Sequence, residues 1–303
     1  MLRLLSILLC RFFFRSVNIS GTPYTGKSSI WCANHTGAIV DPMVMLGLAP
    51  VKLRPIAKHT LWKMPGMKQL LTITHAIPIK RLQDLKKDSL ALSEMLTKDI
   101  DDHVMQQNLN NDAFQAVCEV LLEGGNILIF PEGVSHDSPY IHPLKTGLAR
   151  MALIALSKAK EENFSIIIQP VSIDYSEKTE FRSDVSLHFC EPIAVSSLET
   201  SVKEIMNSVR DSLENGIASF FTWDEKRNWR FLFELTYGRS PYSAQEFRLF
   251  VENNRAGFDQ DPVFLARIQT LRRMMQVIDI SPIQMIWGEA NQKKRNFFWL
   301  ILR

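Results

Sequence analysis

Short apolar runs that end in polar, turn-forming residues constrain the fold of this chain more than any other feature. Residues 28–33 form one such run directly before His35 and its neighbour Asn34, and residues 126–130 form another directly before Pro131. Runs of about four to eight apolar residues bounded by turn signals are typical of buried strands. Strands that alternate with helices and end in polar residues predict an α/β domain with its functional site at the strand ends.

The other periodicities of the sequence extend this pattern. Helices are expected at 42–48, 84–123 (with a weak centre at 106–111) and 146–160, and further strands at 73–79, 165–173 and 185–189. After Pro192 apolar residues recur at helical spacing, at 202–213 and at 261–275. The sequence therefore divides into a lead-in at 1–24, an α/β domain at 25–196 and a helical extension at 197–303.

His35 and Asp41 are the first candidates for chemistry. An imidazole can take a proton, and a nearby carboxylate fixes its tautomer and stabilises the imidazolium that results. Six positions along a helix turn through about 600°, so the two side chains meet only if the backbone turns between them, and Thr36-Gly37 offers that turn. Asp41 directly before Pro42 is also typical of a helix N-cap. The residues by themselves leave both roles open.

Further motifs follow His35 and Asp41 in a fixed order along the chain. They are Ala76-Ile77-Pro78-Ile79-Lys80-Arg81, Phe130-Pro131-Glu132-Gly133, Pro143-Leu144-Lys145-Thr146-Gly147 and Ile168-Gln169-Pro170-Val171. Together these blocks resemble the motifs of the glycerolipid acyltransferase family, which includes the lysophosphatidic acid and glycerol-3-phosphate acyltransferases. The resemblance covers about residues 25 to 195. It implies a mixed sheet flanked by helices for this part of the chain.

Five residues separate His35 from Asp41, one more than in the usual motif of that family. The longer spacing resembles a subset that includes the yeast-type glycerol-3-phosphate and dihydroxyacetone-phosphate acyltransferases and some bacterial relatives. The difference concerns the acceptor more than the chemistry.

The resemblance implies a catalytic pair and a phosphate site. His35 would be the general base and Asp41 the carboxylate that orients it. Arg81 would bind the phosphate of the acceptor, because the guanidinium group offers a fork of donors that matches phosphate geometry. Lys145 would be a second phosphate contact and Lys80 a weaker third. An acyl thioester is already activated, so neither a metal nor a cofactor is expected.

The block around Glu132 carries the remaining candidates. Glu132 would position the phosphate-binding arginine or form a hydrogen bond with an acceptor hydroxyl, and Gly133 would let the main chain approach the ligand closely. For Ser135, His136 and His142, which are near this block in sequence, a hydrogen bond within the loop is the better interpretation.

The cysteines and the overall charge exclude several other classes of function. The four cysteines are scattered without paired spacing, which argues against a disulfide framework and against zinc and indicates a reducing compartment. Cys32 lies in an apolar run, so we interpret it as strand packing rather than as a nucleophile. No Gly-x-Ser-x-Gly elbow is present, which disfavours a serine hydrolase. A net charge of +3 is mild, so any basic surface must come from local clustering.

Two terminal segments suggest contact with a membrane. On a helix, Arg3, Arg11 and Arg15 fall within about 120° of one another with apolar residues around the remainder, as in a helix that lies in a membrane interface. Packing of this helix on its own domain is the alternative. The stretch 293–303 joins a basic cluster to an aromatic and aliphatic run, which could be a second interfacial anchor or the start of a spanning helix. No run reaches the roughly 18 to 20 apolar residues of a span.

The segment 52–87 is the most basic of the chain, with nine lysines and arginines against the single acidic residue Asp84. Apolar residues interleave with these charges, which suits an anionic membrane surface or a phosphorylated substrate. No nucleic-acid fold signature accompanies the segment, so nucleic acid is not expected as a partner.

These observations predict a membrane-associated O-acyltransferase at the cytoplasmic face. Its donor would be acyl-CoA or an acylated acyl carrier protein, and its acceptor 1-acyl-glycerol-3-phosphate. Glycerol-3-phosphate or dihydroxyacetone phosphate is the alternative acceptor. A catalytically silent membrane-binding protein of the same fold is the alternative from a different class.

Overall fold

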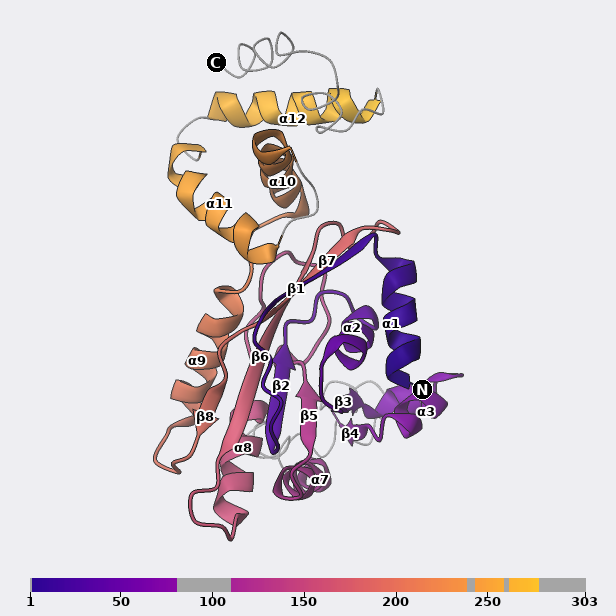
Figure 1. Ribbon diagram of the computed structural model, residues 1–303, viewed down its shortest axis with the longest axis vertical. Coiled ribbons are helices and arrows are strands. Elements are labelled where there is room, and N and C mark those ends of the chain that lie inside the picture. Colours follow the sequence, from indigo (N-terminus) through magenta and orange to yellow (C-terminus); the bar gives the residue numbers. More distant parts are fainter. Residues whose placement is uncertain (1, 81–109, 239–242, 259–261, 278–303) are drawn as a thin grey trace, which may run out of the picture.

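The computed structural model of the protein describes residues 2–80, 110–238, 243–258 and 262–277 (Figure 1). Within these residues the chain forms one mixed sheet of eight strands in the order β1-β7-β6-β2-β5-β3-β4, with β8 paired to β6 off this path. The strands are β1 (Ser16–Gly21), β2 (Ser29–Ala33), β3 (Arg54–Lys58), β4 (Ile77–Ile79), β5 (Asn126–Ile129), β6 (Ile166–Tyr175), β7 (Asp184–Phe189) and β8 (Ile193–Val195). The predicted α/β class with a mixed sheet is confirmed.

The strands next to the centre of the sheet run parallel. β2 pairs in parallel with β6 on one side and with β5 on the other, β5 pairs with β3, and β3 with β4. β7 and β8 run antiparallel to β6, whereas β1 runs parallel to β7. Carboxyl ends of adjacent parallel strands lie at the same edge of a sheet, so the chain segments that follow β2 and β5 leave side by side.

Alternation along β2 explains why helices cover both faces. Ile30 and Cys32 belong to one core cluster and Trp31 and Ala33 to the other, because successive side chains of a strand point to opposite faces. All five residues of β2 are buried, as expected for a central strand that lies between two layers of helices.

The first core cluster is covered by α7 (Asn111–Leu122), α8 (Gly147–Lys158) and α9 (Val202–Glu214). The second cluster is covered by α1 (Leu2–Phe13) and α2 (Val40–Leu48). Figure 1 shows α1 and α2 on one side of the sheet and α8 and α9 on the other. α9 begins at a full capping box, in which Ser201 and Glu204 bond each other's main-chain N–H groups.

Three helices beyond α9 form a separate cluster. They are α10 (Trp223–Tyr237), α11 (Ala244–Phe258) and α12 (Pro262–Val277), and they enclose aromatic residues such as Phe233 and Phe247. Figure 1 shows them beyond one end of the sheet. The apolar side of α9 instead joins the sheet core through Ile205 and Leu213. The helices that form a core of their own therefore begin with α10, while Lys226 of α10 and Ala244 of α11 contact the sheet.

The predicted strand at 73–79 is wrong over its first half. α3 (Met67–Ile73) ends there, the chain turns through His75 with φ of 51°, and β4 contains only Ile77–Ile79. The β-branched pair Ile73-Thr74 favours a strand in sequence terms, but the preceding leucines complete a helical turn. β1, β3 and β8 were not predicted, because these strands are short and mostly half-exposed and lack a continuous apolar run.

The other predicted elements agree with the structure within a few residues at their ends. α2, α8, α9 and α12 correspond to the helices expected at 42–48, 146–160, 202–213 and 261–275. Of the expected helix at 84–123 only the part that forms α7 lies inside the described residues, and the basic and aromatic stretch at 293–303 lies outside them. Among the described helices, none combines the length and apolarity that a bilayer crossing requires.

Candidate active site

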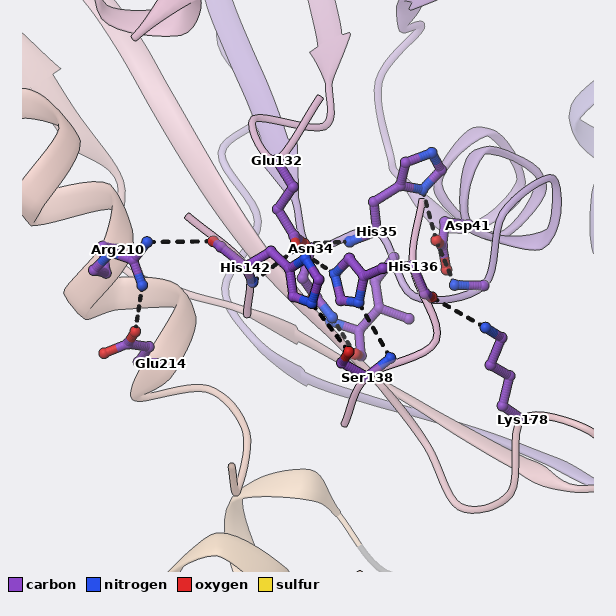
Figure 2. A network of polar contacts seen from close by, with 12 residues as sticks. Asn34, His35, Asp41, Glu132, His136, Ser138, His142, Lys178, Arg210 and Glu214 are labelled. Atoms are coloured by element: carbon purple, nitrogen blue, oxygen red, sulfur yellow. Dashed lines mark hydrogen bonds and ion pairs between the residues drawn. The ribbon is translucent and has the colours of Figure 1, made fainter. Parts of the chain in front are cut away.

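The loop between β2 and α2 brings His35 and Asp41 together. The chain turns after β2 through residues 34–39, with Ala38 at φ of 51°, and Asp41 lies in the first turn of α2. The Nδ1 atom of His35 lies 2.8 Å from Oδ2 of Asp41 (Figure 2). The main-chain N–H of Gly37 donates to the same carboxylate oxygen at 2.8 Å. The turn that the sequence predicted is therefore present and closes the pair.

Asp41 is not the cap of α2. The N-cap position is Ile39, which makes no side-chain cap bond, and the carboxylate of Asp41 instead points at His35. The carboxyl group is completely buried. Of the two roles that the sequence left open, the structure supports that of a partner for the imidazole.

The geometry also sets the tautomer of His35. A buried carboxylate accepts, so Nδ1 carries the proton and Nε2 keeps the lone pair with which a base acts. The ring stacks on Phe130, with centroids 4.2 Å apart and an interplanar angle of 19°. The side chain is 17% exposed, so the ring is held on two sides and still reaches solvent. This arrangement can take a proton from a bound hydroxyl.

Glu132 joins the end of β5 to the His35 loop. Its Oε1 accepts from the main-chain N–H of His35 at 2.7 Å, and its Oε2 accepts from the main-chain N–H of His142 at 2.9 Å. The Nε2 atom of His136 also contacts Oε2, and Figure 2 shows the three groups around the carboxylate. Glu132 is buried and both of its oxygens have protein partners. Sequence reasoning missed this hold on the main chain of His35.

His136 and His142 form hydrogen bonds within their loop, as we expected from the sequence. The rings stack with centroids 3.6 Å apart, Nδ1 of His136 accepts from the main-chain N–H of Ser138 at 3.2 Å, and Nε2 of His142 lies 3.0 Å from the Ser138 hydroxyl. Burial lowers the pKa of His136, against the opposing effect of Glu132. His136 is therefore a neutral ring near pH 7, with its proton on Nε2.

The same three residues are the group of described side chains best placed to hold a metal ion. One donor atom each from Glu132, His136 and His142 lie within 4.8 Å of one another. However, a ring nitrogen that binds a metal must offer a lone pair, whereas Nε2 of His136 donates its proton to Glu132. The observed arrangement is a hydrogen-bonded network rather than a set of converging ligands.

Gly133 and Lys145 lie next to each other beside this network. Gly133 has φ of 74°, and a Cβ atom there would come within 3.2 Å of Cγ of Lys145. The left-handed backbone therefore favours glycine at this position, and the lysine stem leaves little room for a side chain there. The main-chain N–H of Lys145 donates to the carbonyl of Pro131 at 2.7 Å, and the side chain is exposed.

Lys80 directly follows β4, at the same edge of the sheet as the residues that follow β5. β4 lies two strands from β5, so the two strands are about 10 Å apart. Its main chain exchanges two hydrogen bonds with the side chain of Asn110, each 2.8 Å long. Arg81 lies outside the described residues, so its predicted phosphate contact stays a prediction.

Two further residues support the site and have no counterpart in the sequence-based assignments. Asn34 exchanges hydrogen bonds of 2.8 and 2.7 Å with the main chain of Ile173, which links the end of β2 to β6. The hydroxyl of Tyr175, the last residue of β6, donates to Asp41 at 2.5 Å. A tyrosine at the end of an apolar strand was the signal for this contact, but the predicted strand stopped two residues short of it.

A family model described as acyltransferase matches residues 16–174, slightly more than half of the chain. The chain is 29% identical over 171 residues to glycerol-3-phosphate O-acyltransferase 2 of Saccharomyces cerevisiae. The aligned region covers 54% of this chain and 22% of that protein. It is 26% identical over 137 residues to 1-acyl-sn-glycerol-3-phosphate acyltransferase of Limnanthes alba. This aligned region covers 45% of this chain and 41% of that protein.

The chain thus spans less than half the length of these curated relatives. Among solved structures, it is similar to the 1-acyl-sn-glycerophosphate acyltransferase PlsC from Thermotoga maritima. The TM-score is 0.47 and the sequence identity 18%, over 70% of this chain and 77% of that one.

Proposed function

Because the chain belongs to the acyltransferase family, we propose that it transfers a fatty acyl group from an acyl thioester to a hydroxyl of a phosphorylated glycerol acceptor. The observation that carries the proposal is the imidazole of His35, bonded at 2.8 Å to the fully buried carboxylate of Asp41. A buried carboxylate on Nδ1 leaves Nε2 as a base, which is the group that acyl transfer to a hydroxyl needs.

In the proposed mechanism Nε2 of His35 takes the proton of the acceptor hydroxyl while the oxygen attacks the thioester carbonyl. The carbon–sulfur bond of the tetrahedral intermediate then breaks, and the leaving thiolate takes the proton from the imidazolium. Asp41 stabilises the imidazolium between the two steps. The products are the acylated acceptor and the free thiol, and no covalent enzyme intermediate forms.

Basic residues at the same edge supply the proposed phosphate site. Lys145 is exposed beside Gly133, Lys80 lies on the same edge, and Arg81 is the next residue along the chain. A phosphate that these side chains bind would hold the glycerol hydroxyl near the strand ends, where the base is.

Two acceptors fit this proposal. 1-Acyl-glycerol-3-phosphate is the acceptor in the name of the Limnanthes alba relative, and glycerol-3-phosphate is the one in the name of the yeast relative. The five-residue spacing between His35 and Asp41 and the longer alignment with the yeast protein support glycerol-3-phosphate, or its ketone counterpart dihydroxyacetone phosphate.

α1 supports a membrane surface as the proposed partner. One side of this helix is buried at Ser6 and Cys10, and a Cβ atom on Gly47 of α2 would come within 2.9 Å of Ser6. The other side exposes Leu4, Leu5, Leu8, Phe12 and Phe13. Both alternatives from the sequence are thus compatible, since the helix packs on its own domain and still presents an apolar face.

Phe181 extends the exposed apolar face of α1. Its ring centroid lies 5.3 Å from that of Phe12 and 6.2 Å from that of Phe13, and it is 60% exposed. Arg3 and Arg11 are exposed on the same helix. An apolar face flanked by arginines suits the interface of an anionic leaflet, such as the cytoplasmic one. Co-sedimentation with anionic liposomes, reduced by high salt, would be the direct check.

The decisive experiment is an acyl-transfer assay with the purified chain and a panel of acceptors. Glycerol-3-phosphate, dihydroxyacetone phosphate and 1-acyl-glycerol-3-phosphate are each offered with acyl-CoA and with acylated acyl carrier protein. We expect transfer to at least one acceptor and loss of that transfer in His35→Ala. A folded, liposome-binding protein that transfers to none of them would instead support the catalytically silent alternative.

A further inference from the structure

Tyr175 is a buried tyrosine that none of the acyltransferase motifs includes. It closes β6, and the side chain of its neighbour Asp174 points to the opposite face of the strand. Its hydroxyl donates to Oδ1 of Asp41 at 2.5 Å, and the residue is 3% exposed. Asp41 therefore accepts from three donors: the ring N–H of His35, the main-chain N–H of Gly37 and this hydroxyl.

The Tyr175 hydroxyl stays protonated at neutral pH and well above it, because its pKa is raised from an already high value. Burial raises the pKa of Tyr175 well above its usual value, and the negative charge of Asp41 raises it further. A phenol that cannot ionise remains a donor to the carboxylate. The contact is therefore a hydrogen bond to an anion, which is stronger than one between neutral groups.

Neighbouring elements fit closely around this bond. The ring of Phe14, directly after α1, stacks on Tyr175 with centroids 5.8 Å apart and an angle of 27°. A Cβ atom on Gly37 would come within 2.5 Å of Oδ1 of Asp41 and 2.7 Å of the Tyr175 hydroxyl. The loop, the helix end and the strand end thus hold the carboxylate in one orientation.

We propose that Tyr175 is a positioning residue for the His35–Asp41 pair. Its hydroxyl fixes the rotation of the carboxylate so that Oδ2 faces Nδ1 of His35, and it shares the negative charge that the imidazolium would otherwise attract alone. The inference rests on the proposed function only in that it takes His35 as the base.

Other ionisable groups lie near this pair on the surrounding elements, although Asp174 points to the other face of β6. Cys10 of α1 is a neutral thiol, because burial raises its pKa to about 11. Asp174 of β6 is paired with Lys226 of α10. Glu132 and His136, from the loop after β5, reach His35 through its main-chain N–H and carbonyl. These groups are shared by the parent and by the variants below, so a change in pH dependence reports the missing hydroxyl.

The test replaces Tyr175 by phenylalanine, which keeps the ring and its stacking on Phe14. We expect kcat to fall by about 10- to 100-fold with the KM of donor and acceptor nearly unchanged, because misplacing the base affects the reacting step more than binding. Asp41 then attracts the ring proton more strongly, so the base stays protonated to higher pH. The acid limb of the kcat/KM profile should move upward by about 0.5 to 1 pH unit.

Ser172→Ala is the matched control. Ser172 also lies buried on β6, and its hydroxyl donates to the carbonyl of Leu213 on α9 at 2.9 Å. The control removes a buried hydroxyl from the same strand without touching His35 or Asp41. We expect Ser172→Ala to lower Tm about as much as Tyr175→Phe does and to leave the pH profile of kcat/KM unchanged. Equal pH profiles for the parent and Tyr175→Phe, or the same shift in Ser172→Ala, would overturn the proposal.

Two further measurements separate this proposal from the proposed function. If Tyr175 acts through Asp41, the double variant Tyr175→Phe/Asp41→Asn is no slower than Asp41→Asn alone. Additive losses would instead show that Tyr175 acts by another route. Nitrogen-15 NMR of the His35 ring needs no turnover: the ring of Tyr175→Phe should take up its second proton at a higher pH than the ring of the parent. A parent that transfers no acyl group refutes the proposed function, whereas the NMR comparison still decides the role of Tyr175.

Discussion

Buried carboxylates lie in two regions of this protein and have different kinds of partner. At the strand ends, Asp41 and Glu132 accept from main-chain N–H groups, a tyrosine hydroxyl and imidazole rings. Where α10 meets the sheet, the carboxylates instead pair with lysine and arginine. These pairs are Lys226–Asp174, Arg227–Glu177 and Arg230–Asp184, with Arg15 as a second partner of Asp184.

The difference follows from what each carboxylate has to do. If His35 acts as the proposed base, a fixed cation on Asp41 would cancel its attraction for the imidazolium, so neutral donors suit this pair. At the junction the opposite charges bring two layers of structure into one register, and each charge compensates the burial of the other. The charges at the strand ends are thus left available for the proposed reaction, and the charges where α10 meets the sheet are used within the fold.

The largest expected effect comes from removing the charge of Asp41. Asp41→Asn should lower kcat by about 10²- to 10⁴-fold, because Asn cannot stabilise the imidazolium and can hold the ring in the wrong tautomer. Tm should fall by only a few degrees. The check is steady-state kinetics with thermal unfolding of the same preparation. Near-normal turnover would mean that His35 works without Asp41.

The second effect concerns stability rather than rate. Lys226→Met leaves Asp174 buried without its cation, and breaking such a pair costs about 3–5 kcal/mol of unfolding free energy. Replacing both residues, as in Lys226→Met/Asp174→Leu, should recover most of the loss. Denaturant unfolding measures both, and kcat of the folded Lys226→Met protein should stay within a few-fold of the parent. A large drop in kcat would show that the junction also tunes the catalytic pair.

The third effect tests whether Arg81, in contrast to the arginines paired with carboxylates near α10, binds the phosphate of the acceptor. Arg81→Ala should raise the KM of the acceptor, because the lost charge-assisted bond to phosphate contributes about 1.5 to 3 kcal/mol. The KM of the acyl donor should change little. Equal rises for donor and acceptor, or no change in either, would contradict the phosphate role.

The smallest effect tests the neutral state of His136. Burial lowers its pKa in the folded protein, so unfolding takes up a proton and stability falls as the pH drops below the unfolded value of about 6.5. His136→Gln can still donate to Glu132 but does not titrate. Its free energy of unfolding should therefore depend less on pH than that of the parent, by at most about 1.4 kcal/mol per pH unit, as denaturant unfolding at several pH values would measure. A steeper dependence in the variant would reverse the assigned sign.

Much of the catalytic edge was predictable because it depends on local sequence. The apolar run of β2 and the turn at Thr36-Gly37 predicted that His35 and Asp41 could meet. The run of β5 predicted the turn that follows it, although Glu132, which that turn was expected to expose, is buried. The misjudged strand at 73–79 shows the limit of the same method, since a short β-branched pair can end a helix as well as start a strand.

Local patterns were sufficient to predict the α/β class, the family and the residues at the carboxyl ends of β2 and β5, because periodicity and turn residues act over a few positions. Three contacts are visible only in the folded chain: Tyr175 donates to Asp41, Glu132 accepts from the main chain of His35, and α10 docks through Asp174. These contacts join residues 134, 97 and 52 positions apart. Such partners depend on strand order and register, which the packing of both faces of the sheet selects and no local pattern records.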